Sequence, residues 1–238
     1  IIAKHIKMNS KAVYIFPSEL FHPEKINSSL NGFKKEDILF LAITLYLNIL
    51  ENLDGKKNKL DVYCIWNENE KDNLPEELKN NNCNFIFVDE AKQKELFEKL
   101  SSNEFSSYKN NLVVFSDVIN LKPDDYDQCF KLLNAENESL VIAKNKEDNI
   151  AAFGFNKYSE DVFSGLISSK FNYNEFLGKI ESFEHFIHIV SDVLLVRNIN
   201  NFKQLYFELS QKKSLVYCSQ HIHERFTHLF VEYKDLLK

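Results

Sequence analysis

The sequence predicts an α/β protein with a mostly parallel central sheet that helices cover on both faces. Short apolar segments, rich in β-branched and aromatic residues, alternate along the chain with segments of helical periodicity. Such alternation is typical of three-layer α-β-α sandwiches, whose strands are buried on both faces. The clearest strand is 112–115, four consecutive apolar residues that are followed by Ser116 and Asp117.

The composition is that of a soluble globular protein. The chain has 238 residues, which suits one large α/β domain or one domain with an appendage. Hydrophobic residues make up 44% and charged residues 27% of the chain. A net charge of -6 and a pI near 5.7 argue against nucleic acid as a partner, because nucleic acid requires a basic surface.

Several common motifs are missing from the sequence. The 5 glycines are not clustered, which excludes the glycine-rich loops of Rossmann and P-loop nucleotide sites. The 4 cysteines contain no CxxC pair, so we expect no zinc site and a reducing, cytoplasmic location. The longest apolar stretch, 38–50, is interrupted by Thr44 and Asn48, and we therefore predict no membrane span.

In the first half of the chain, each expected strand ends at a polar or proline residue. Pro17 ends the first strand, since proline cannot donate to a ladder. The first long helix has apolar residues nearly all round and should be buried on more than one side. The expected elements are a strand at 11–17, a polar loop at 18–35, a helix at 35–53, strands at 60–66 and 84–88, and a helix at 90–100. A further short helix is expected to begin at Pro75.

In the second half, the strand at 112–115 is followed by further alternation. The expected elements are a helix at 122–133, strands at 139–143 and 150–156, helices at 161–166 and 173–180, strands at 186–190 and 193–196, and a helix at 200–212. We find no internal repeat and no linker. The sequence therefore predicts one α/β domain at 1–213 and a C-terminal helical extension, 214–238, packed on it.

Four local segments, in this order, resemble a known fold family. They are 113–121 (Val-Val-Phe-Ser-Asp-Val-Ile-Asn-Leu), 140–150 (Leu-Val-Ile-Ala-Lys-Asn-Lys-Glu-Asp-Asn-Ile), 152–155 (Ala-Phe-Gly-Phe) and 198–205 (Asn-Ile-Asn-Asn-Phe-Lys-Gln-Leu). With the order of the elements, they make the chain similar to the GT-A fold of nucleotide-diphospho-sugar transferases. More narrowly, it resembles the bacterial glycosyltransferase A-like family of unknown function number 2064. The resemblance spans about residues 11 to 209.

The resemblance implies a divalent metal, Mg²⁺ or Mn²⁺, at the diphosphate of a nucleotide-sugar. The metal ligands that it implies here are Asp117 and, as partners, Glu147 and Asp148. The substrate-binding residues that it implies are Ser116, Asp117 and Asn200. It identifies no catalytic residue.

The chain departs from the family at three places. The family's Asp-Gly-Gly-Tyr segment is Glu-Asp-Asn-Ile at 147–150, and its Asp-Val-Asp-Thr segment is Asn-Ile-Asn-Asn at 198–201. Amides bind hard cations more weakly than carboxylates do. The loop after the first strand carries Glu19 and Glu24 where the family has a basic element.

Each of these residues also fits a structural role. Asp117 could occupy a turn or cap a helix, Glu147 and Asp148 could lie in a solvated hairpin, and Asn198 with Asn200 could begin a helix. Histidines 221 and 228 lie two helical turns apart, roughly 10 Å, which is too far for two ligands of one ion.

Two functions from different classes remain open. The first is a glycosyltransferase-like protein, atypical or degenerate, that binds a nucleotide-sugar; a nucleotidyltransferase of the same fold is a variant of it. The alternative is a non-catalytic scaffold that kept the fold and lost the site. We expect a monomer or homodimer in either case, and the sequence leaves enzymatic activity open.

Overall fold

A computed structural model describes residues 10–21, 30–56, 59–79, 83–88, 97–98, 100–101, 104–180 and 186–238. Its strands form a seven-stranded sheet in the order β3-β2-β1-β4-β6-β5-β7. The strands are β1 (Lys11–Phe16), β2 (Asp61–Asn67), β3 (Asn84–Val88), β4 (Asn110–Phe115), β5 (Ser139–Lys144), β6 (Ile150–Phe155) and β7 (Phe186–Asp192).

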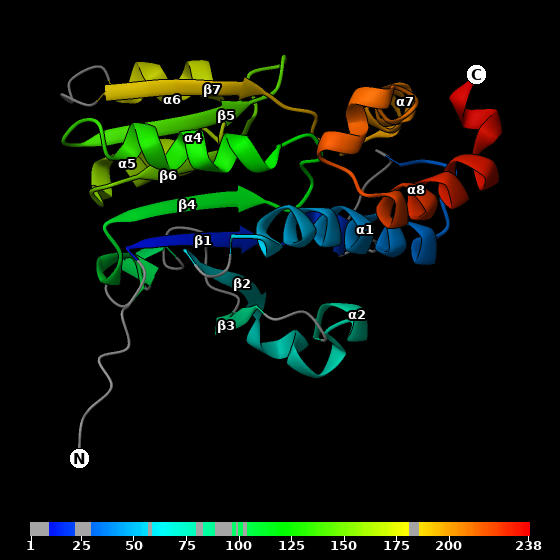
Figure 1. The fold of residues 1–238 in the computed structure, drawn as a ribbon, viewed down its shortest axis with the longest axis horizontal. Helices are drawn as coiled ribbons and strands as arrows, with labels where there is room; N and C mark the ends of the chain where they lie inside the picture. The colour runs from blue at the N-terminus through cyan, green and yellow to red at the C-terminus, as the bar shows by residue number, and fades with distance from the viewer. Residues whose placement is uncertain are drawn as a thin grey trace.

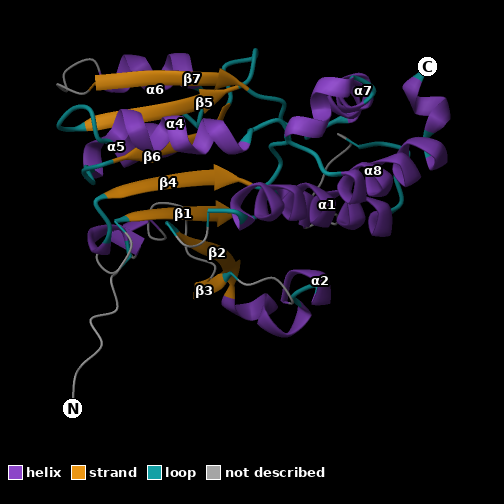
Figure 2. Ribbon diagram, viewed as in Figure 1, coloured by secondary structure: helices purple, strands orange, loops and turns teal. Residues whose placement is uncertain are grey.

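The sheet is mostly parallel, as predicted. Strand β1 pairs in parallel with β2 and β4, β2 with β3, and β5 with β7, whereas β6 runs antiparallel to β4 and β5. As a result, β1, β4 and β7 point the same way in Figure 2, and their carboxyl ends meet at one edge of the sheet.

Helices cover both faces of the sheet and confirm the predicted three-layer α-β-α sandwich. The helices are α1 (Lys35–Asp54), α2 (Glu76–Lys79), α4 (Pro123–Leu133), α5 (Glu160–Ser168), α6 (Tyr173–Ile180), α7 (Ile199–Leu209) and α8 (Gln220–Glu232). One core joins the sheet to α1, α4, α7 and α8, and the other joins it to α5 and α6. Alternate residues of β4 serve the two cores: Leu112 and Val114 one, Val113 the other.

Helix α1 is buried on more than one side, because it shares a core with the sheet and also contacts α8. Its residues 41 to 46 are all buried. Arg225 of α8 places its guanidinium 4.4 Å from the ring of Phe40 and donates from Nε to Thr44 Oγ1 at 3.1 Å. Figure 1 shows α1, α7 and α8 grouped beyond the arrowheads of β1 and β4.

Two expectations differ from the structure or lie outside it. Residues 193–196 do not form a strand of the sheet; instead, Leu195 makes an isolated antiparallel bridge to Val118. Most of the helix expected at 90–100 falls outside the described residues.

Among the described helices, none has both the length and the apolar character that crossing a bilayer would require.

Two glycines offer a matched test of the packing. A Cβ at Gly154 of β6 would lie 3.0 Å from Leu133 Cδ1 and 3.2 Å from the Asn111 carbonyl oxygen, whereas a Cβ at Gly178 of α6 would meet no atom within 4 Å. We expect Gly154→Ala to lower the free energy of unfolding by about 1–3 kcal/mol, because the core must shift. We expect Gly178→Ala to raise it by about 0.5–1 kcal/mol, since alanine favours a helix interior. Urea denaturation measures both, and equal effects of the two variants would contradict the packing.

Candidate functional site

The candidate site lies where β1 and β4 end side by side. Phe16 and Phe115 are register partners, and the chain leaves both strands at the same edge of the sheet. The turn after β4 carries Ser116 and Asp117, both buried, and Asp117 is only 2% exposed. In open parallel sheets this edge is where ligands bind.

Asp117 forms an ion pair with Arg197. The Arg197 Nε donates to Asp117 Oδ2, and the Arg197 side chain is 45% exposed whereas that of Asp117 is 3% exposed. The pair joins the end of β4 to the segment between β7 and α7. Because a buried carboxylate without a counter-charge is costly, this contact satisfies a requirement that the burial of Asp117 creates.

The backbone holds Arg197 in this position. Val196 N donates to the Asp117 carbonyl oxygen at 2.8 Å, and Ile119 N donates to the Leu194 carbonyl oxygen at 3.2 Å. The segment 194–196 therefore pairs with 117–119, and this pairing places Arg197 beside Asp117.

Two buried oxygens at this edge have no hydrogen-bond partner in the described part of the protein: Ser18 Oγ and Asp117 Oδ1. Ser18 N donates to Ser116 Oγ at 2.8 Å, which ties the loop after β1 to the turn after β4. An unsatisfied buried polar atom is expensive. These two are among eleven such side-chain atoms in the described residues, and Asp117 Oδ1 belongs to the carboxylate that pairs with the half-exposed Arg197. The arrangement can accept a hydrogen bond at Asp117 and face an anion at Arg197.

The side chain of Asp148 forms its hydrogen bonds with residues other than Asp117. Asp148 lies in the turn between β5 and β6, as the hairpin interpretation predicted, with a φ of 62°. Its Oδ1 accepts from Lys144 Nζ at 2.6 Å and its Oδ2 from Asn174 Nδ2 at 2.7 Å. The hydrogen bond to Asp148 raises the pKa of Lys144. The side chain of Glu147 is exposed.

These carboxylates fit a divalent metal poorly. Asp117 already has a cation on Oδ2, and both oxygens of Asp148 have partners. None of the hydrogen bonds and ion pairs among the described residues joins Glu147 or Asp148 to Asp117. Within the described residues, no three His, Cys, Asp or Glu side chains form a group that could hold a metal ion. Metal coordination by Asp117, Glu147 and Asp148 remains a prediction from the resemblance.

The Asn-rich segment at 198–201 begins α7. Asn198 is the N-cap and accepts from Asn201 N at 2.9 Å, while Asn201 Oδ1 accepts from Arg197 N at 3.3 Å. Asn200 is exposed in the first helical turn. Asn198 therefore has the helix-start role that its residue type suggested, and substrate binding by Asn200 stays a prediction.

Sequence reasoning missed Arg197. One signal was available, because the chain contains only two arginines, Arg197 and Arg225, among 29 basic residues. Both lie in ion pairs with carboxylates, and Arg225 Nη1 is 2.7 Å from Glu77 Oε2. In a chain that otherwise uses lysine, each arginine marks a place where the planar guanidinium matters.

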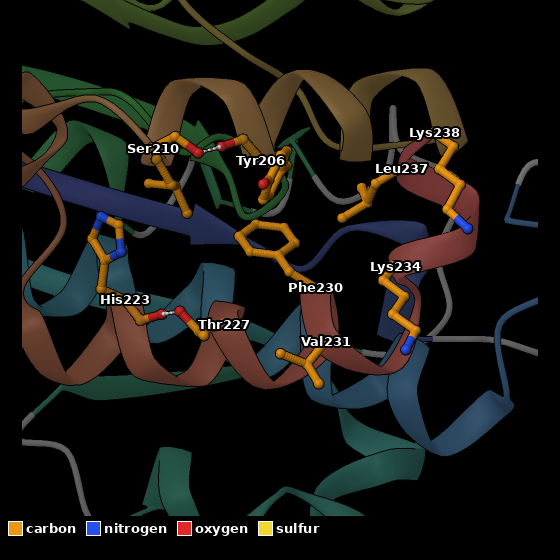
Figure 3. A pocket seen from close by; sticks show the side chains of 10 residues that line it. Tyr206, Ser210, His223, Thr227, Phe230, Val231, Lys234, Leu237 and Lys238 are labelled. Carbon is orange, nitrogen blue, oxygen red and sulfur yellow. Dashed lines mark hydrogen bonds between the residues drawn. The ribbon is translucent and has the colours of Figure 1, made fainter.

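A pocket with a volume of about 540 Å³ lies between α7 and α8, and none of Ser18, Ser116, Asp117 and Arg197 lines it. Figure 3 shows Tyr206 of α7 and Ser210, which follows α7, on one side of it and His223, Thr227 and Phe230 of α8 on the other. Burial lowers the pKa of His223, whose Nε2 lies 2.9 Å from Ser214 Oγ. This groove contains none of the residues that the sequence singled out as a site.

Comparisons with solved structures identify the fold. A protein from Desulfovibrio desulfuricans G20, provisionally assigned as a nucleotide-diphospho-sugar transferase, is 17% identical, with a TM-score of 0.71 over 95% of this chain and 99% of that one. The 4-diphosphocytidyl-2C-methyl-D-erythritol synthase of Anaerococcus prevotii DSM 20548 is 12% identical, with a TM-score of 0.55 over 85% and 99%. Rv0371c of Mycobacterium tuberculosis H37Rv, in a complex with manganese, is 10% identical, with a TM-score of 0.50 over 83% and 98%.

No protein-family model and no curated protein matches the chain in sequence. At these identities the structural likeness establishes the fold alone. The chain thus has the fold of the nucleotide-diphospho-sugar transferases, and its resemblance to family 2064 is not established by these comparisons.

The ion pair can be tested by a double-mutant cycle. We expect Arg197→Met to lower the free energy of unfolding by about 1–3 kcal/mol, because it leaves the buried Asp117 carboxylate unpaired. Asp117→Asn combined with Arg197→Met should recover part of that loss, since no buried charge remains. Lys157→Met, which removes an exposed pair with Glu138, is the control and should change stability by less than about 0.5 kcal/mol. Additive effects at 117 and 197, measured by urea denaturation, would rule the coupling out.

Proposed function

We propose that this protein binds a nucleotide or nucleotide-sugar at the edge where β1 and β4 end. The observation that carries the proposal is the group of buried polar atoms there: Ser18 Oγ and Asp117 Oδ1 without partners, beside the half-exposed Arg197. The fold supports the proposal, because a protein with the same architecture carries a nucleotide-diphospho-sugar transferase assignment.

The chemistry of the atoms suits such a ligand. A carboxylate oxygen accepts hydrogen bonds, and the hydroxyls of a ribose or a hexose donate them. Serine hydroxyls and an arginine donate to phosphate oxygens. Binding would give each buried oxygen the partner that it lacks in the described part of the protein.

Glycosyl transfer by an atypical member of the superfamily, related to family 2064, is the reaction that we favour. The metal that the resemblance implies, Mg²⁺ or Mn²⁺, would require Asp117 to release Arg197, or Asp148 to release Lys144 and Asn174. As the protein stands, Asp117 and Asp148 are engaged with protein partners and not with a metal.

A non-catalytic, partner-binding protein is the second candidate. The structural engagement of Asp148 favours it, and so do exposed apolar side chains on and after α7. Phe207 is 60% exposed, and Leu215 and Val216 are each 59% exposed. Such residues are more typical of an interaction surface than of a surface that faces water alone.

Calorimetry with UDP-, GDP- and CDP-sugars, each with Mn²⁺, tests ligand binding. We expect one of these classes to bind the wild-type protein. Ser18→Ala should weaken that ligand by about 5- to 10-fold, since one hydrogen bond is lost, and should leave the melting temperature unchanged or higher, because the removed Oγ has no described partner.

The matched control is Ser210→Ala, in the groove between α7 and α8, which should leave the affinity unchanged. No heat with any of the three sugar classes, from a protein with an intact melting transition, would reject nucleotide-sugar binding and favour the scaffold. A loss of affinity in Ser210→Ala but not in Ser18→Ala would move the site to the groove.

A further inference from the structure

We infer that Arg197 supplies the positive charge that a divalent metal would otherwise bring to the diphosphate, so that ligand binding here is independent of metal. This inference rests on the proposed nucleotide-sugar site. It follows from the disagreement between the metal site that the resemblance implies and the contacts that the residues make.

The negative charge of Asp117 already has a partner. Its carboxylate is buried, and its negative charge is matched by the guanidinium of Arg197 at Oδ2. A divalent ion on the same carboxylate would have to displace that guanidinium or share the site with it. Like charges at contact distance repel strongly in a partly buried place, so the two arrangements compete.

The other acidic side chains do not complete a metal site around Asp117. A hard cation needs several oxygen ligands, and one free carboxylate oxygen falls far short of that number. Asp148 is held by Lys144 and Asn174 at 2.6 and 2.7 Å, and amides stand at 198, 200 and 201. The described residues therefore lack the carboxylates that would bring a metal to Asp117.

The guanidinium of Arg197 keeps N–H groups that Asp117 does not use. Only its Nε is used by Asp117, and its Nη groups make no hydrogen bond to the described residues. The side chain of Arg197 is 45% exposed, whereas that of its carboxylate partner is 3% exposed, so the cation is the member of the pair that solvent and ligands can reach. Two parallel N–H groups match two phosphate oxygens, a geometry that lysine cannot provide.

Hydrogen bonds hold the backbone around Arg197 in place. The neighbouring backbone is fixed by Val196 N to the Asp117 carbonyl and by Arg197 N to Asn201 Oδ1. A cation that is held in place before the ligand arrives loses little conformational entropy on binding. The ion pair thus positions Arg197 as a binding residue.

The test measures the affinity of UDP-, GDP- and CDP-sugars in EDTA and in Mn²⁺ for the wild type and five variants. For the ligand that binds, we expect the wild-type affinity in EDTA to equal that in Mn²⁺ within about threefold, a difference below 1 kcal/mol. Arg197→Met should weaken binding by about 10- to 100-fold, and Arg197→Lys by less, because lysine keeps the charge but not the fork.

Asp117→Asn distinguishes the two kinds of site most sharply. With Arg197 as the cation, this variant should lose affinity to the same extent in EDTA and in Mn²⁺, because asparagine keeps an oxygen acceptor but no longer holds the guanidinium by charge. With a metal on Asp117, it should lose Mn²⁺-dependent binding. The double variant Asp117→Asn with Arg197→Met removes both charges, should fold as judged by its melting transition, and should not bind. This variant keeps the experiment decisive if Arg197→Met alone is unstable.

Binding that occurs only with Mn²⁺, and that Asp117→Asn abolishes, would overturn the inference while leaving the proposed nucleotide-sugar site intact. Binding by no ligand in either buffer would overturn both. Lys157→Met, whose exposed partner is Glu138, should match the wild type throughout.

Discussion

The burial of the Asp117 carboxylate is the constraint on which the arrangement of this sheet edge depends. The side chain leaves β4 into a place that is only 2% exposed, where an unpaired charge would be strongly destabilising. Arg197 meets that requirement from a segment 80 residues further along the chain. For this contact to form, 194–196 must lie along 117–119, and the backbone bonds between them show that they do. One buried acid thus fixes how the connection from β7 to α7 crosses the edge.

The C-terminal helices pack against the start of α1. Tyr233, which follows α8, donates from its hydroxyl to Asp37 Oδ2 and accepts from Lys34 N at 2.9 Å, both at the start of α1. Its ring stacks on Phe33 at 3.8 Å, and Phe202 of α7 contacts Phe33 as well. The start of α1, the end of α8 and α7 therefore pack as one body.

The fold was more predictable from sequence than the site, for a physical reason. Strand and helix signals are local: the apolar run at 112–115, the stop at Pro17 and the all-round apolar helix at 35–53 each carry their own information. The predicted strand at 193–196 failed because four apolar residues specify burial but not a ladder, and the sheet edge they meet is a turn. Arg197 could not be placed beside Asp117 because nothing local couples residues so far apart. Asp148 could be assigned to a hairpin that also carries Lys144, four residues before it, but its other partner, Asn174, comes from a helix that only the tertiary structure brings to that turn.

An aspartate at the end of a central strand has two quite different uses, and its residue type alone does not distinguish them. As a metal ligand it needs further carboxylates nearby; as the counter-ion of an arginine it is better without them. The amides at 198, 200 and 201 bear on this choice. Carboxylates there would lie within a few residues of Arg197 and would compete with an incoming phosphate for its positive charge. Neutral amides instead cap α7 and leave Arg197 with a single buried counter-charge behind it. The amides that weaken the case for a metal are therefore the same residues that leave the arginine available to an anion, and this consistency supports the proposed metal-independent site.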